Sequence, residues 1–417
     1  MERSWLFKIN PMKRTAADIF KDALALPAEA RAAMLAAVQA LSSEAIALGS
    51  ALGRSLAAPV RSLRAQPPFA ASAMDGYALR AADTPGVLRI VGESAAGHAF
   101  TGTLRAREAV RISTGAPIPP GGDAVLIQEE ARIEGGQLHS GAVASGRHIR
   151  SAGVDFAADE IVLEPGRNVD PIALALAAAA GAATVQVVRR PHLTILCAGD
   201  EIAPPGAALR DDQIFESCSY AISGLATQWG ALAKRVGALP DDPGAIAHAA
   251  EEALRTSDLV VFIGSASVGP HDLARPVFES LGARIFVPKV DMRPGKPTWF
   301  ALTPAAPVLG LPGNPASAIV AAVLFLKPLL ERMLGRSGEL AFRHARLAKA
   351  MPENGPREAY LRAQAKEVGG EIWIEAAADQ DSSLLSVLAG ANALLVRPAR
   401  APPARRGEDS EFMSLFL

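Results

Sequence analysis

The chain has few of the residues that build disulfide-rich or zinc-organised proteins. Its 417 residues include two cysteines, Cys197 and Cys218, and seven histidines. Two cysteines cannot form a disulfide framework, so we expect reduced thiols in a cytosolic protein. The histidines are scattered along the chain, and no spacing among them suits a zinc site. Both classes are therefore excluded.

An excess of charge and a long hydrophobic run are also lacking. The formal net charge is -1, which argues against a general nucleic-acid binder. Residues 1–8 contain no apolar core of the kind found in secretory signals. Residues 171–188 carry no charge, but alanine is their commonest residue, and alanine is too weakly apolar to drive membrane insertion. We expect a cytoplasmic protein without a nucleic-acid partner or a membrane segment.

The sequence pattern divides the chain into segments of different predicted structure. Residues 12–60 have apolar side chains at helical intervals, which predicts helical structure. A helical pattern returns after residue 147, with a helix that starts at Asp170 and stops at Gly181. Residues 61–146 have short apolar runs and frequent glycines, which indicate a small β module. The predicted domains are listed in chain order: 12–60 with 147–189, a helical scaffold or dimer surface; 61–146, an inserted β domain; 190–336, an α/β domain; and 337–417, a C-terminal β domain.

The α/β domain carries the strongest pattern. Apolar runs without alternation begin at Leu193, Leu259 and Val308, and helical text separates them. Such runs are typical of a parallel sheet that helices cover on both faces. Each run ends close to a glycine, and ligands of open α/β sheets bind at the carboxyl ends of strands. The helix that begins at Pro315 offers free N–H groups to an anion. We therefore expect the functional site at this edge.

Polar residues of both signs follow these strands. The acids are Asp200, Glu201, Asp272 and Asp291, and the bases are Lys289, Arg293 and Lys296. Carboxylates can hold Mg²⁺, which in turn bridges to phosphate oxygens, while the bases and glycine turns bind an anion. The pattern predicts a phosphorylated or nucleotide-like substrate with a hard cation. A solvated surface would also carry mixed charges.

Three other motifs of catalysis or nucleotide binding do not fit. The glycine spacing from Gly264 to Gly269 is that of a phosphate-binding loop, but Pro270 and His271 stand where Lys and Ser or Thr are required. No G-x-G-x-x-G follows a strand, which argues against a dinucleotide fold. No Ser-His-Asp order is recognisable.

Several short motifs in a fixed order carry a family resemblance. They are Ser72-Ala-Met-Asp-Gly-Tyr-Ala78, Thr114-Gly-Ala-Pro-Ile-Pro119, Gly199-Asp-Glu201, Ser267-Val-Gly269 with Asp272, Pro294-Gly-Lys-Pro297 and Leu311-Pro-Gly-Asn-Pro315. Together they resemble the molybdopterin molybdenumtransferases, the family of the bacterial MoeA proteins and the gephyrin E domain. The resemblance extends from about Leu24 to the C-terminus.

The resemblance implies a fold and a reaction. The fold has an elongated helical region, an inserted β domain, an α/β molybdopterin-binding domain like that of MogA and a C-terminal β-barrel domain. The reaction inserts molybdate into adenylylated molybdopterin with Mg²⁺ and releases AMP. Family members are homodimers that share the site between subunits. A molybdopterin adenylyltransferase and molybdoenzyme apoproteins are further expected partners. The alternative is a non-catalytic paralogue that binds a pterin or nucleotide ligand or acts as a scaffold.

The matching motifs also assign roles to residues. The implied catalytic residues are Asp75, Thr114, Glu201 and Asp272, of which Glu201 and Asp272 are the implied metal ligands. The implied substrate contacts are Gly199, Asp200, Ser267, Gly269, Lys289, Lys296, Pro312, Pro315, Arg362 and Ser383, the last within a motif of Ser382, Ser383 and Ser386.

This chain departs from the family pattern at several site positions. Ala198 replaces a hydroxyl residue, Ser265 and Ala266 replace glycine and a β-branched residue, and Cys218 replaces an asparagine. We therefore expect a divergent member with weaker or altered ligand binding, in which the acids of the cation site remain.

Overall fold

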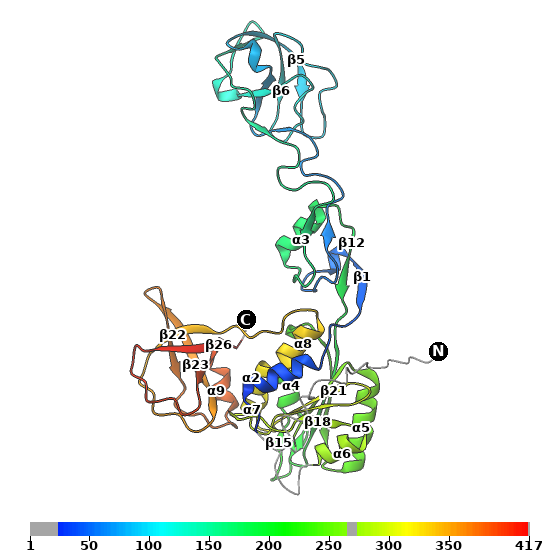
Figure 1. Ribbon diagram of the computed structural model, residues 1–417, viewed down its shortest axis with the longest axis vertical. Helices are drawn as coiled ribbons and strands as arrows, with labels where there is room; N and C mark the ends of the chain where they lie inside the picture. Colours follow the sequence, from blue (N-terminus) through cyan, green and yellow to red (C-terminus); the bar gives the residue numbers. More distant parts are fainter. Residues whose placement is uncertain (1–23, 265–272, 416–417) are drawn as a thin grey trace, which may run out of the picture. The chain divides into compact units, whose positions relative to one another are not determined.

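The computed structural model describes residues 24–264 and 273–415. Ser267, Gly269 and Asp272 lie outside the described residues. The chain divides into two compact units, Met1–Ser43 with Val188–Leu417 as unit 1 and Glu44–Val187 as unit 2. Figure 1 shows the elements of each. No helix among the described residues is long and apolar enough to cross a membrane.

Unit 1 is built on a six-stranded sheet. The strand order is β16 (Leu232–Leu239), β13 (His192–Ala198), β17 (Leu259–Ile263), β21 (Pro307–Leu311), β20 (Trp299–Leu302) and β18 (Arg284–Val287). The first four strands are parallel, as the sequence predicts, whereas β20 runs antiparallel to both of its neighbours, β21 and β18. Only residues 303–306 separate β20 from β21, and a connection this short can join only antiparallel neighbours.

Helices cover both faces of this sheet (Figure 1). On one face the core contains residues of α5 (Pro243–Thr256) and α6 (Ala274–Ser280). On the other it contains residues of α2 (Pro27–Ala36), α4 (Cys218–Gln228), α7 (Pro315–Ala321) and α8 (Lys327–Met333), with a π-helical turn, Ala322–Leu326, between the last two. All five residues of β17 are buried, which explains its uninterrupted apolar run.

The C-terminal part of unit 1 is a closed barrel of five strands. The ring is β23 (Glu358–Val368), β24 (Glu371–Ala376), β22 (Arg343–Leu347), β26 (Asp409–Ser414) and β25 (Ala393–Arg397), and β25 pairs again with β23. Ile374, Leu395 and Phe412 fill its core, and α9 (Leu385–Ala389) follows the loop after β24. The short strand β19 (Met292–Arg293) of the α/β domain pairs with the start of β23.

Unit 2 contains the expected β module. Its sheet has the order β7 (Ala124–Ile127), β4 (Gly76–Leu79), β6 (Glu108–Ile112), β5 (Gly86–Ser94), β9 (Gln137–Ser140) and β8 (Arg132–Glu134). Small apolar clusters that include Leu88 and Val110 pack in this module. Strand β3 (Ala71–Ser72) pairs with β10 (Ile149–Arg150), so the beginning and end of the module lie together.

The remainder of unit 2 has one helix, α3 (Pro171–Ala179). The Asp170 carboxylate accepts the Ala173 N–H at 2.7 Å, and Gly181 follows with φ +89°, as the sequence predicts. The helical structure predicted over residues 12–60 is wrong beyond Ala36, because β1 (Ser43–Ala47) pairs with the distant β12 (Thr184–Val188). Helix α2 packs against α8 in unit 1.

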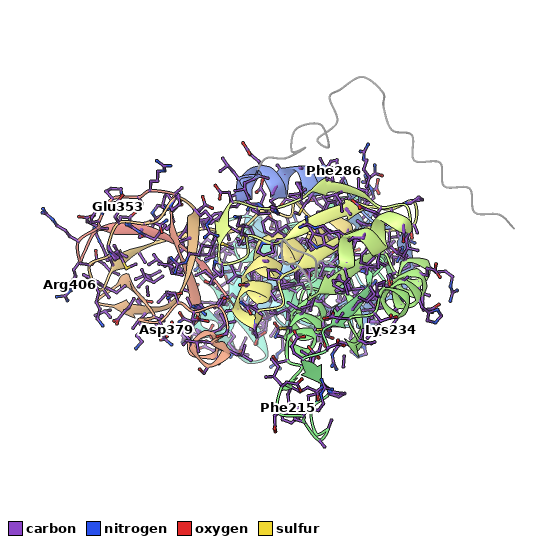
Figure 2. All side chains as sticks on the ribbon, turned by 90° about the horizontal axis from the view of Figure 1, so that it is seen from below. Phe215, Lys234, Phe286, Glu353, Asp379 and Arg406 are labelled. Carbon is purple, nitrogen blue, oxygen red and sulfur yellow. The ribbon has the colours of Figure 1, made fainter. Side chains whose placement is uncertain are left out.

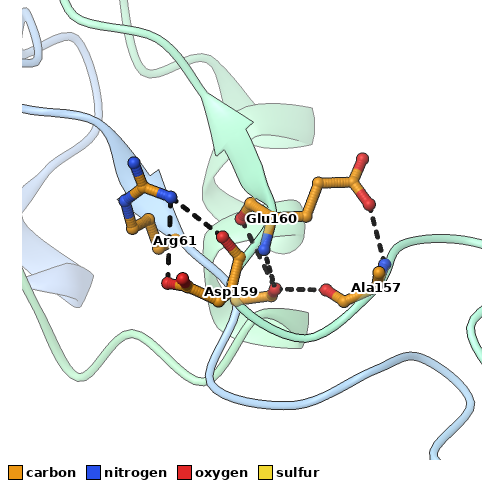
Figure 3. Close-up of polar contacts among 5 residues, drawn as sticks. Arg61, Ala157, Asp159 and Glu160 are labelled. Atoms are coloured by element: carbon orange, nitrogen blue, oxygen red, sulfur yellow. Dashed lines mark hydrogen bonds and ion pairs between the residues drawn. The ribbon is translucent and has the colours of Figure 1, made fainter.

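Two chain segments are held together where they lead into and out of the β module (Figure 3). Strand β2 (Val60–Arg61) pairs with β11 (Ile161–Leu163). The Ser62 hydroxyl donates to the Ala157 carbonyl at 2.5 Å and accepts the Glu160 N–H at 3.1 Å. Arg61 donates to the Asp159 carbonyl at 2.9 Å. These bonds satisfy backbone groups at a point where the β pairing ends.

Candidate functional site

A cleft of about 660 Å³ opens in unit 1 at the carboxyl ends of β13 and β21. Glu201, Asp241 and Asp381 supply its acids, and Arg293, Lys296 and Arg357 supply its bases. The other lining residues are Ala198, Gly199, Pro294, Gly295, Pro297, Pro312, Gly313, Asn314, Ser317, Gln380 and Ser382. Both the α/β domain and the barrel contribute, so the cleft is a joint product of two domains.

Two glycines allow the strand ends at the cleft to pack closely. A Cβ atom at Gly199 would lie 2.6 Å from a carboxylate oxygen of Glu201, so glycine lets that side chain fold back over the strand end. Gly264 has φ +115°, and a Cβ there would lie 2.2 Å from the Ala198 carbonyl oxygen. The ends of β13 and β17 can therefore meet only if residue 264 is glycine.

Asp200 organises the acidic wall through its backbone and its side chain. Its carboxylate accepts the Asp241 N–H at 3.1 Å. Its carbonyl accepts from Arg210 at 3.2 Å and from Gln213 at 3.1 Å. Unlike Glu201, Asp200 does not line the cleft among the described residues. The loop it anchors projects from the domain and carries the exposed Phe215 (Figure 2).

The basic wall comes from the turn that the sequence singled out and from the barrel. Arg293 and Lys296 flank the Pro294-Gly295 turn, and both are exposed. Arg357 donates to the Met292 carbonyl at 3.4 Å, which holds the start of β23 beside this turn. Lys289 does not line the cleft in the described chain; its carbonyl accepts the Ala25 N–H at 3.2 Å.

Arg362 lies beneath this wall and is 1% exposed. Its Nη1 donates to the Asp381 carbonyl at 2.7 Å, and its Nε donates to the Gln380 side-chain oxygen at 3.2 Å. Nη2 is buried and has no acceptor among the described residues. Burial lowers the pKa of Arg362, and Asp379 and Asp381 oppose that effect.

The turn before α7 is fastened to the barrel. Asn314 donates to the Ser382 hydroxyl at 2.9 Å, and the Ala316 N–H donates to the Ser382 carbonyl at 3.1 Å. Ser383 donates both its N–H and its hydroxyl to Asp381, at 2.8 and 2.7 Å. Ser383 therefore fixes the loop, while its neighbour Ser382 lines the cleft.

The two thiols lie below the cleft floor. Cys218 is 7% exposed and donates to the Gly313 carbonyl at 3.3 Å, and Cys197 is 4% exposed. Burial, followed by the charge of Glu216, raises the pKa of both thiols, that of Cys218 to about 11. Both are expected to be protonated at neutral pH and unreactive.

Asp75 and Thr114 meet in unit 2. The Thr114 N–H and hydroxyl both donate to one carboxylate oxygen of Asp75, at 2.6 and 2.9 Å. The backbone bond is the larger cause, the hydroxyl bond the next, of a lowered pKa at Asp75. Both residues are exposed, so the pair is available to a ligand.

The carboxylates of the cleft fit a magnesium ion. Mg²⁺ prefers oxygen ligands and usually binds through one or two protein carboxylates together with substrate phosphates. Glu201 and Asp241 provide two such groups on one wall. The described residues contain no group of three or more acids, histidines or cysteines that could hold a metal alone, so a ligand would have to complete the coordination.

Comparisons with known proteins agree along most of the chain. The model of the MoeA N-terminal region (domain I and II) matches residues 26–181, that of a probable molybdopterin binding domain matches 194–332, and that of the MoeA C-terminal region (domain IV) matches 344–415. A molybdopterin molybdenumtransferase from a Nostoc species is 34% identical over 381 residues, which cover 88% of this chain and 87% of the relative. The chain belongs to the molybdopterin molybdenumtransferase family.

Other members of this transferase family are similarly close. The molybdopterin molybdenumtransferase of Bacillus subtilis is 31% identical over 369 residues, 85% of this chain and 86% of the relative. The crystal structure of a molybdopterin biosynthesis MoeA protein from Pyrococcus horikosii is 28% identical and has a TM-score of 0.82, with 94% of this chain and 99% of that chain covered. The predicted family, fold class and enzyme class, a transferase of molybdenum cofactor biosynthesis, are thereby confirmed.

Sequence motifs predict some of the cleft residues but not others. Gly199, Glu201, Lys296 and Pro312 line the cleft, and Arg362 and Ser383 contact residues that do. Pro315 begins α7 and does not line it in the described chain. The missed residues are Asp241, Ser317, Arg357, Gln380 and Asp381. Asp241 had a signal, since it follows β16 as Glu201 follows β13, but Gln380 had none.

Proposed function

We propose that this chain inserts molybdate into adenylylated molybdopterin, with Mg²⁺ as the cation and AMP as the leaving product. The supporting observation is that one cleft combines the carboxylates of Glu201, Asp241 and Asp381 with the cations of Arg293, Lys296 and Arg357. A dianionic oxyanion needs positively charged donors, and a cation bound to phosphate needs carboxylates, so both kinds of group are required in one cleft. The names of the relatives support molybdopterin as the substrate class, and the carboxylates of the cleft support Mg²⁺ as the cation.

The two walls have different tasks in this proposal. Glu201 and Asp241 would hold Mg²⁺, which when bound neutralises phosphate charge and so favours departure of AMP. Arg293, Lys296 and Arg357 bind molybdate and offset its charge before it meets the pterin. Asp272, Ser267 and Gly269 belong to the same proposal as family positions, with Asp272 as a further metal ligand.

Asp75 and Thr114 act through an oriented hydroxyl. Because the Thr114 hydroxyl donates a hydrogen bond to Asp75 at 2.9 Å, the lone pairs of its oxygen remain for a hydrogen-bond donor or a cation. Asp75 itself has a lowered pKa, so it serves as an anion that orients Thr114, and it is a poor proton donor at neutral pH. We propose this pair as a second catalytic element.

A homodimer and a cytoplasmic location complete the proposal. Helix α3 consists of apolar residues alone, and its Ile172 is 76% exposed. An apolar helix face of this kind is a suitable surface for a second copy of the chain. Two free thiols suit a reducing compartment. A molybdopterin adenylyltransferase upstream and molybdoenzyme apoproteins downstream are the partners that this activity would require.

The test is direct assay of the purified chain with adenylylated molybdopterin, molybdate and MgCl₂. We expect release of AMP that stops when EDTA removes the metal. Glu201→Gln should lower turnover by about a hundredfold or more, in line with the loss of a charged ligand. The matched control is Glu353→Gln, since Glu353 lies on the barrel outside the cleft lining (Figure 2). A folded wild-type chain that releases no AMP and cannot rescue a strain lacking molybdenum insertion would favour the scaffold alternative.

A further inference from the structure

We propose that Gln380 is the positioning residue that aims the Arg362 guanidinium at the oxyanion substrate. This inference rests on the proposed function, and it extends that function by assigning a role to a residue without a sequence motif. Gln380 lines the cleft, whereas Arg362 lies behind it and is 1% exposed.

Gln380 forms hydrogen bonds with three groups of Arg362. Its side-chain oxygen accepts the Arg362 backbone N–H at 3.0 Å and the guanidinium Nε–H at 3.2 Å. Its side-chain nitrogen donates to the Arg362 carbonyl at 3.0 Å and to the Ala377 carbonyl at 2.9 Å. A rotated amide would set donors against donors, so these four bonds fix the amide and the guanidinium together.

The four bonds also exhaust the hydrogen-bonding capacity of Gln380. An amide oxygen accepts two bonds and an amide nitrogen donates two, and all four are used. Gln380 therefore has nothing left to offer a ligand, although it lines the cleft. Its influence on a bound anion has to pass through Arg362.

Arg362 retains one donor nitrogen, Nη2 with its two N–H groups, for that anion. Nη1 is used by the Asp381 carbonyl at 2.7 Å, while Nη2 is buried without an acceptor among the described residues. Native proteins rarely leave a buried guanidinium donor unsatisfied. The Arg362 guanidinium bonds to Gln380 and Asp381, which both line the cleft beside Arg293, so an oxyanion bound there is a suitable acceptor.

The loop that carries Gln380 is fixed at its other end. Ser382 accepts the Asn314 side-chain N–H at 2.9 Å and, through its carbonyl, the Ala316 N–H at 3.1 Å. The loop is therefore held by α7 on one side and by β23 on the other. Gln380 supplies the contacts on the β23 side.

The experiment measures molybdate affinity by calorimetry and the KM for molybdate with kcat in the complete chain. The variants are Gln380→Ala, Gln380→Met, which fills the same space without hydrogen bonds, Arg362→Ala and the double variant. We expect Gln380→Ala and Gln380→Met to raise the KM about tenfold, with kcat changed less than about twofold. Because Gln380 acts through Arg362, the double variant should be no weaker than Arg362→Ala.

Gln364→Ala is the matched control. Gln364 lies on β23, the strand that carries Arg362, and donates to the Gly390 carbonyl outside the cleft lining. The KM of this variant for molybdate should therefore equal that of the wild type. Thermal melting of each variant distinguishes a misfolded protein from a folded one in which the Arg362 guanidinium is misplaced. Additive losses in the double variant, or full recovery with Gln380→Met, would overturn the positioning role in an active enzyme. A wild-type chain that neither binds molybdate nor turns over would overturn the proposed function as well.

Discussion

Thr114 donates its backbone N–H and its hydroxyl to the same oxygen of Asp75, at 2.6 and 2.9 Å. The two groups come from separate strand ends, since Asp75 precedes β4 and Thr114 follows β6, and β4 and β6 are paired. The hydroxyl is therefore oriented by the fold before any ligand arrives.

This orientation makes the activity depend on the hydroxyl at residue 114. Thr114→Val keeps the shape and the backbone bond but removes the oxygen, and kcat should fall by about ten- to a hundredfold, the equivalent of one hydrogen bond to a charged partner. Thr114→Ser should stay within about threefold of the wild type. Steady-state AMP release measures both. Equal loss in the two variants would show that the methyl group, and not the hydroxyl, matters.

The same contact predicts how Asp75 titrates. Its pKa lies below the ordinary value of 3.8, with the Thr114 backbone bond as the largest cause and the hydroxyl bond as the second. A lowered pKa means that the ionised form persists in acid and is lost only as the pH falls through the folded value. In Thr114→Ala the pKa should move up toward 3.8 without reaching it, because the backbone bond remains. Carboxyl-carbon NMR titration of both proteins measures the shift.

The buried thiols should resist alkylation in the folded protein. Burial, with Glu216 as the second cause, raises the pKa of Cys218 to about 11, so about a thousandth of the thiol is ionised at pH 8. Iodoacetamide should label neither Cys197 nor Cys218 in an hour, and mass spectrometry should find both labelled after unfolding in guanidinium. Rapid labelling of the native chain would instead support a reactive role.

An ion pair at the amino end of the sheet should be worth measurable stability. Arg189 donates to both oxygens of Asp258, at 2.6 and 2.5 Å, and the His192 N–H adds a third bond at 2.8 Å. Burial alone would raise the pKa of Asp258, but these bonds outweigh it and the pKa is lowered.

Asp258→Asn should therefore lower the free energy of unfolding by about 1–2 kcal/mol at pH 7. The loss should shrink as the pH falls through the folded pKa, because the wild-type carboxylate then becomes neutral as well. Urea unfolding at pH 7 and at a pH below the folded pKa of Asp258 measures this loss of stability. Asp159→Asn is the control: the Asp159 side chain is 88% exposed in its pair with Arg61, so its replacement should change stability by less than about 0.5 kcal/mol.

Gly310 admits no side chain. A Cβ there would lie 2.0 Å from two atoms of the Trp299 ring, which is fully buried. Gly310→Ala should lower the free energy of unfolding by about 1–3 kcal/mol through forced repacking. Gly224→Ala in α4 has nothing within 4 Å of its new Cβ and should raise stability by up to about 1 kcal/mol. Thermal unfolding of both variants provides the comparison.

Local signals made part of the fold predictable. Asp170, Pro171 and Gly181 mark α3 because the cap, the first-turn proline and the terminal glycine are all local devices. Strand β1 could not be predicted, since Ser43–Ala47 becomes a strand only by pairing with β12, which lies far along the chain. The reversed strand β20 likewise depends on a short turn that composition does not specify.

The candidate site divides in the same way. Glu201 and Lys296 lie in turns with motifs of their own, and both line the cleft. Lys289 has the right charge and neighbourhood in sequence, yet it does not line the described cleft, because its segment pairs with Ala25 instead. Gln380 and Arg357 come from the barrel, and only the assembled fold brings them to the α/β domain.

The ladder between β19 and β23 joins these two domains through backbone bonds, with Met292 opposite Glu358 and Arg293 opposite Ala359. The Asn314–Ser382 contact makes a second attachment. Neither domain can loosen without exposing backbone groups of the other, so the barrel and the α/β sheet should melt in one cooperative transition. A chain truncated before β22 would lose Arg357, Gln380, Asp381 and Ser382 from its cleft and also the strand that pairs with Arg293.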